Sequence, residues 1–142
     1  MALPIIVEQV FTTEPKLLWE YLTSPLYMRQ WFFENIPDFI PVVGFSTRFN
    51  VEAGERQFMH LWKILDVIEE RRIVYDWRYQ GYEGAGRVTF ELLPCKTGTL
   101  LRLTNEGLET FSQDIPEFTR ASCEGGWKCF IGESLTKFLE NQ

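Results

Sequence analysis

The chain has 142 residues, of which 45% are hydrophobic and 24% charged, a balance that suits one globular domain spanning 1–142. Its net charge is −6 and no basic run exceeds Arg71-Arg72, which argues against nucleic acid and anionic membranes as partners. The N-terminal stretch MALPIIVEQV has no basic region and no long apolar core. We therefore expect no signal peptide, no integral membrane association and a cytoplasmic location.

The first elements follow from turn and capping signals. Residues 4–12 are rich in β-branched side chains and predict a strand. Thr13 is the expected N-cap of a helix that has Pro15 in its first turn, and a second short helix is expected over 25–31. Residues 32–44, which hold two prolines and a glycine, predict a loop.

Five strands are expected next, joined by short turns that predict an antiparallel meander. Their expected ranges are 45–51, 56–68, 72–79, 86–93 and 99–105. Alternation is clear in the third, where Ile73, Tyr75, Trp77 and Tyr79 share one face. One face of the sheet is therefore expected to be buried.

The last third of the chain predicts one long helix. Asp114 and Glu117 resemble a capping box, from which the helix is expected to run to about residue 140. One stripe of that helix collects Cys123, Trp127, Phe130, Ile131, Ser134, Leu135 and Phe138. Gly125 and Gly126 each cost about 1 kcal/mol relative to alanine inside a helix. Close packing against the sheet, or a function, is expected to compensate.

The strand 56–68 leaves its own orientation open. If Leu65 and Val67 point inward, then Phe58, His60, Trp62 and Ile64 point outward and form an apolar exposed strip. That strip predicts a homodimer through Phe58, Trp62 and Ile64. The alternative is a β-bulge that reverses the phase within this long strand.

Signals for metal, cofactor or catalytic sites are weak. Cys95, Cys123 and Cys129 form no CxxC pair, and they are expected to be reduced thiols. His60 is the only histidine, so the usual multi-histidine metal site cannot form. The sequence has no phosphate-binding glycine loop and no nucleophile elbow. We therefore expect no metal, no cofactor and no identifiable catalytic set.

The order of these elements resembles the helix-grip fold of the START-like (SRPBCC) superfamily, and within it the family of the activator of the heat-shock-protein-ninety ATPase. The segments that carry the resemblance are 13–19, 22–25 with Trp31, 63–67, 71–77, 98–103, 105–107 and Gly126-Trp127. The resemblance implies an α+β fold in which a curved antiparallel sheet of about six strands wraps around a long C-terminal helix. It also implies two short helices after the first strand and a cavity between sheet and helix. The chain departs from the family at Trp62, where a glycine is common, and we expect one domain where the chaperone regulator has two.

The resemblance implies three functional hypotheses. The first is a protein that binds a small hydrophobic or amphipathic molecule in the cavity. Its expected contacts are Trp31, Trp77, Tyr79, Phe90, Leu103, Trp127, Ile131 and Ser134. The second is a cyclase or hydrolase that uses the same cavity with His60, Glu106 or a tyrosine as acid or base. The third is a protein-interaction module related to the chaperone regulators, which predicts a collapsed interior.

Overall fold

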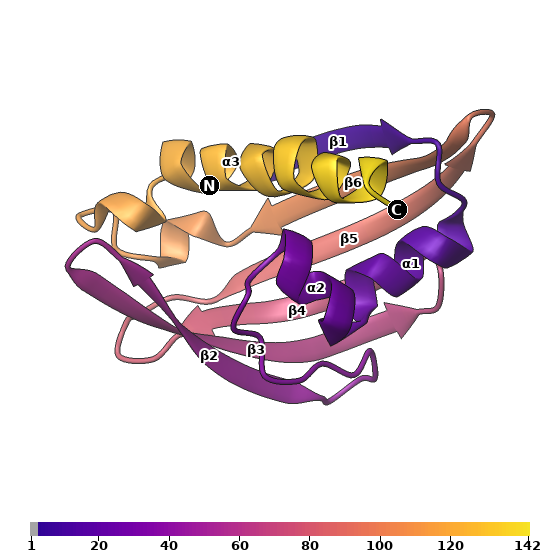
Figure 1. The fold of residues 1–142 in the computed structure, drawn as a ribbon. Helices are drawn as coiled ribbons and strands as arrows, with labels where there is room; N and C mark the ends of the chain where they lie inside the picture. Colours follow the sequence, from indigo (N-terminus) through magenta and orange to yellow (C-terminus); the bar gives the residue numbers. More distant parts are fainter. Residues whose placement is uncertain (1–2) are drawn as a thin grey trace.

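A computed structural model describes residues 3–142, which form one antiparallel six-stranded sheet with all helices on one side of it (Figure 1). The strands are β1 (Ile5–Phe11), β2 (Ser46–Ala53), β3 (Arg56–Ile68), β4 (Arg72–Tyr79), β5 (Gly86–Cys95) and β6 (Gly98–Glu106). Their spatial order is β1-β6-β5-β4-β3-β2, so β2 to β6 form the expected meander and β1 adds to its far edge. Strands β5 and β6 extend further than expected because their turn needs only two residues, with Cys95 paired to Gly98.

Two short helices follow β1, as expected: α1 (Pro15–Thr23) and α2 (Pro25–Trp31). Glu14, and not Thr13, is the N-cap of α1, because Pro15 occupies the first helical position. The carbonyl oxygen of Thr13 instead accepts a hydrogen bond of 2.7 Å from the Thr99 hydroxyl. This bond fixes the start of α1 to β6.

The C-terminal helix begins later than Asp114. The 3-10 turns η1 (Leu108–Thr110) and η2 (Pro116–Phe118) precede it, and α3 (Arg120–Trp127) then starts with Thr119 as N-cap. The predicted capping box is therefore wrong, because the Thr119 hydroxyl takes the capping role and accepts a bond from the Ser122 amide at 3.3 Å. The helix continues as the π-helical segment η3 (Lys128–Leu135) and ends as α4 (Thr136–Glu140). Among residues 3–142, no helix is long and apolar enough to cross a bilayer.

The glycines of this helix do not approach the sheet closely, contrary to the expectation. A Cβ added at Gly125, Gly126 or Gly132 would meet no heavy atom within 4 Å. Gly98 is the opposite case, since its φ is +147° and an added Cβ would lie 2.1 Å from the carbonyl oxygen of Phe11. Glycine is thus sterically required at the β5–β6 turn but not in the helix.

Replacing Gly125 with alanine is expected to stabilise the protein by about 1 kcal/mol, because alanine loses less backbone entropy in a helix. Gly125 is exposed and the new methyl group would meet open space. Urea unfolding followed by circular dichroism measures the change. A lower midpoint than the parent protein would show that the methyl group meets an obstacle.

A β-bulge in β3 overturns the predicted exposed strip. Phe58, Trp62 and Ile64 are 3%, 2% and 1% exposed, so they face the core and cannot form a dimer surface. The register with β4 shifts between Ile64 and Asp66, which leaves Leu65 as the extra residue, turned outward. The sequence pattern assumes strict alternation back from Val67. Because the bulge adds one residue, that alternation assigns the residues before Leu65 to the wrong face of the sheet. The proposed dimer contact through these three side chains is therefore wrong.

Candidate functional site

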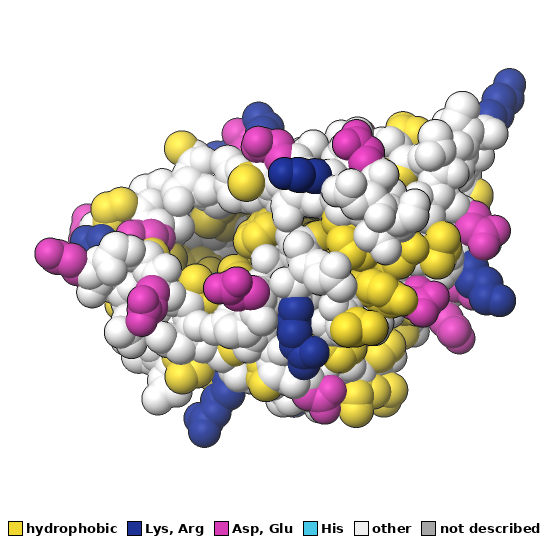
Figure 2. All heavy atoms as spheres, viewed as in Figure 1, with side chains coloured by type: hydrophobic (Ala, Val, Ile, Leu, Met, Phe, Trp, Pro, Cys, Tyr) yellow, Lys and Arg dark blue, Asp and Glu magenta, His cyan; other side chains and the backbone are white. Residues whose placement is uncertain are grey.

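The interior holds two hydrophobic clusters with a cavity of about 140 Å³ between them. The larger cluster joins the sheet to the helices, and the smaller one, called here the end cluster, consists of Phe58, Phe111 and Phe118. Figure 2 shows the recess on the face that carries the helices, with hydrophobic side chains in its depth. Side chains from both clusters line the cavity, so the cavity separates the two clusters.

Four adjacent strands form the floor of the cavity. His60 on β3 pairs with Tyr79 on β4, and Val88 on β5 pairs with Asn105 on β6. Each of these side chains points to the inner face and lines the cavity, together with Trp77. The floor thus combines aromatic surface with polar groups near its two edges.

The C-terminal helix forms the roof. Cys123, Gly126, Trp127 and Phe130 line the cavity and lie three or four residues apart, so they share one face of the helix. The missing side chain at Gly126 leaves open space at this wall. The helix therefore supplies aromatic rings to the cavity and an exposed glycine at its edge.

Residues outside the sheet and helix close the two ends. Phe33, which follows α2, contacts the His60 ring at a centroid distance of 5.0 Å. At the other end Phe111 and Phe118 of the end cluster line the cavity. The Phe111 ring lies over Gly86, where an added Cβ would be 3.3 Å from it. Glycine on the central strand thus makes room for this end wall.

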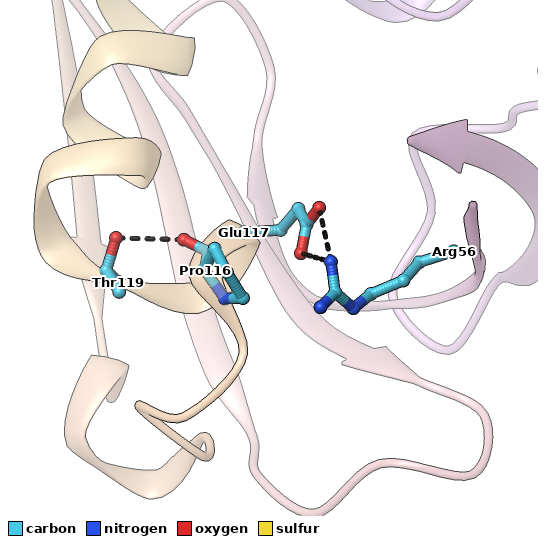
Figure 3. Close-up of polar contacts among 4 residues, drawn as sticks. All are labelled: Arg56, Pro116, Glu117 and Thr119. Carbon is cyan, nitrogen blue, oxygen red and sulfur yellow. Dashed lines mark hydrogen bonds and ion pairs between the residues drawn. The ribbon is translucent and has the colours of Figure 1, made fainter. Parts of the chain in front are cut away.

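An ion pair joins the start of β3 to η2 (Figure 3). Arg56 at the start of β3 binds both carboxylate oxygens of Glu117 on η2 at 3.3 Å. Their side chains are 47% and 30% exposed, so the pair contributes at most about 1 kcal/mol. Glu117 is the one carboxylate among the lining residues, and Arg56 balances its charge.

The other titratable groups of the cavity are uncharged at neutral pH. Burial lowers the pKa of His60 to about 4, against the smaller raising effect of its bond to the Phe58 carbonyl. Burial also raises the pKa of Tyr79, despite the hydrogen bond that its oxygen accepts from Trp77 at 3.0 Å. The pKa of the Cys123 thiol is likewise raised by burial. Apart from the Glu117 carboxylate, which Arg56 pairs, the cavity is therefore apolar with neutral polar groups.

The family model described as "Activator of Hsp90 ATPase homolog 1-like protein" matches residues 12–140. This chain belongs to that family. The resemblance inferred from the sequence is thereby confirmed. No curated protein matches the chain.

Solved structures share the fold of this family member. MLL2253 from Mesorhizobium loti is 29% identical, with a TM-score of 0.75, and the match covers 99% of this chain and 98% of that one. CV1439 from Chromobacterium violaceum is 20% identical, with a TM-score of 0.76 and coverages of 95% and 93%. The Aha1 dimer from Colwellia psychrerythraea, solved in solution, is 17% identical, with a TM-score of 0.70 and coverages of 92% and 91%. The predicted α+β helix-grip fold is confirmed.

The structure brings three of the eight predicted contact residues together at the cavity: Trp77, Tyr79 and Trp127. The other five lie outside its lining. Trp31, Phe90, Leu103 and Ile131 are at most 2% exposed and fill the larger cluster, while Ser134 donates a bond of 2.7 Å to the Trp31 carbonyl. These five are predicted contacts because they lie on inward-facing stripes. Periodicity shows which side chains face inward, but not which of them border a cavity and which pack against other side chains.

Sequence reasoning missed most of the remaining wall. Phe33, Phe111 and Phe118 come from loops and 3-10 turns, where no periodic pattern fixes the direction of a side chain. Phe130 lies on the predicted helix stripe but is not among the predicted contacts. The sequence pattern predicts His60 on the outer face, whereas the bulge at Leu65 places it at the cavity.

Proposed function

We propose that the protein binds a small hydrophobic or amphipathic molecule in the cavity between the sheet and the C-terminal helix. The supporting observation is a recess of about 140 Å³ lined mainly by aromatic rings, with a few neutral polar groups and the Glu117 carboxylate that is paired with Arg56. Ligand sites in proteins usually have this composition. An engineered apolar cavity of about 150 Å³ binds benzene, so the space suits a molecule with one ring.

The alternatives receive less support. A cyclase or hydrolase needs an acid or base in the cavity, and His60, with its pKa lowered to about 4, is a weak base at neutral pH. An interaction module was expected to have a collapsed interior, whereas a cavity is present. The family description speaks of a chaperone activator, and that role for this chain would concern a surface separate from the cavity.

Native mass spectrometry of the freshly purified protein tests the proposal, followed by denaturing extraction of anything bound. We expect a bound molecule of defined mass, or stoichiometric binding of a one-ring apolar probe such as toluene. A bare protein mass together with no probe binding would rule the proposal out.

Replacing Gly126 with leucine is expected to weaken binding of this probe at least tenfold, because the new side chain would extend along the helix face that lines the cavity. Gly125→Leu is the matched control, since both glycines are exposed but only Gly126 is among the lining residues. Both sites offer open space to a Cβ, so neither substitution starts with a backbone clash. Isothermal titration calorimetry compares the two, and equal losses would contradict a site beneath Gly126.

Self-association and location are also proposals. The Colwellia psychrerythraea relative is a dimer, and we propose a homodimer for this chain without assigning its surface, since the one predicted from sequence is buried. The molar mass in solution tests whether the protein is a dimer.

We further propose a cytoplasmic location, in keeping with three cysteines that form no disulfide.

A further inference from the structure

The hydrogen bond of His60 defines which ring nitrogen is free. Its Nδ1 lies 3.0 Å from the Phe58 carbonyl oxygen, which can only accept, so Nδ1 carries the proton. A neutral imidazole has one proton, and Nε2 is therefore an acceptor with a free lone pair. No group among residues 3–142 donates a hydrogen bond to Nε2, and His60 lines the cavity.

Aromatic rings surround this acceptor. The imidazole lies 4.8 Å from the Tyr79 ring, 5.0 Å from Phe33 and 5.1 Å from Phe49, measured between centroids. Such a setting favours a flat ring that can adopt edge-to-face contacts. Nε2 is not among the buried atoms that lack a partner, so water can reach it from the cavity, and a donor brought by a ligand would take the place of that water.

The other polar groups of the cavity are compatible with a hydroxyl. The Tyr79 oxygen accepts from Trp77 and keeps its own proton for donation. Asn105 is buried with its side chain on the inner face. A cationic ligand is disfavoured because the Glu117 carboxylate is already paired with Arg56.

We infer that the ligand is a monocyclic aromatic molecule with a hydroxyl group, of the phenol class, which donates a hydrogen bond to Nε2 of His60. The inference rests on the proposed function and names the chemistry that this site selects. The volume of about 140 Å³ accommodates about one ring.

Calorimetry with three probes of similar size tests the inference: toluene, phenol and anisole, which has an ether oxygen but no donor. Each is titrated into the wild-type protein and into His60→Phe, which keeps a ring and removes the acceptor. We expect the ratio of phenol to toluene affinity to fall at least tenfold in the variant, or about 1.4 kcal/mol. The ratio of anisole to toluene affinity should stay unchanged.

The outcomes separate the two proposals. If toluene binds, and the ratio of phenol to toluene affinity is the same in the wild-type protein and in His60→Phe, the inference about His60 is wrong and the proposed function stands. If no probe binds the wild-type protein, both fail.

A second measurement, the ¹⁵N signals of His60, uses the wild-type protein alone and so does not require that a variant folds. His60 is the only histidine, so its two ring nitrogens give unambiguous ¹⁵N signals in the wild-type protein. Phenol should shift the Nε2 signal in the direction of hydrogen bonding, while toluene should not. An Nε2 signal that responds equally to both probes, or a protonated Nε2 before any probe is added, would overturn the inference.

Discussion

Replacing Trp62 with alanine is expected to destabilise the protein by about 3–5 kcal/mol, the range for truncating a large buried aromatic side chain. Trp62 is 2% exposed, and its ring lies 4.7 Å from Phe49 and 5.0 Å from Tyr75 between centroids. Its Nε1 is buried and has no hydrogen-bond partner among residues 3–142. Removing that unpaired donor offsets part of the lost packing, so we expect the lower part of the range.

Chemical unfolding in urea, monitored by circular dichroism, measures this loss. Leu61→Ala is the matched control, because Leu61 neighbours Trp62 on β3 and points to the opposite, partly exposed face. It should cost less than half as much. Since small domains have a total stability of about 5–15 kcal/mol, Trp62→Ala can leave the protein barely folded. A loss below about 1 kcal/mol would mean that the ring does not sit in the core.

Acidification should weaken the fold through His60. Its pKa is about 4 in the folded protein, while the ordinary value that applies to the unfolded chain is 6.5. Between these values the unfolded chain binds a proton that the native state excludes. The stabilisation is therefore complete above pH 6.5 and is lost as the pH falls towards 4. The full loss amounts to about 3 kcal/mol.

Unfolding free energies measured between about pH 5 and pH 7 isolate this effect, because most carboxylates stay ionised there. His60→Phe removes the titrating group and should flatten the profile in that range. A wild-type protein whose stability does not change between these pH values would show that the imidazole is solvated in the folded state.

The order of elements could be predicted from the sequence because it depends on local signals. Turn residues separate the strands, and Pro15 and Pro25 each begin a short helix. The phase of β3 could not be predicted, since one extra residue at Leu65 exchanges the two faces and leaves no mark in the composition. The start of the last helix was also missed, because Asp114 and Thr119 both suit an N-cap and tertiary contacts decide between them.

The candidate site was harder to predict than the fold. Trp77 and Tyr79 were assigned correctly to the inner face of β4, and they line the cavity. Whether a buried ring borders a space or fills the core depends on its partners from distant segments. Phe90 illustrates this, because Trp31, Phe32 and Trp127 all pack around it. No periodic pattern contains that information.

The separation of the interior into two clusters bears on how the molecule opens. Tyr79 packs against both clusters, and within residues 3–142 the end cluster has three buried members. Regions with few buried contacts open at a lower free energy than the main core, so the amides of η1 and η2 should exchange with solvent sooner than those of β4 to β6. A molecule in the cavity would touch Trp127 on one side and Phe118 on the other. Its binding would then bring the two clusters into one cooperative unit.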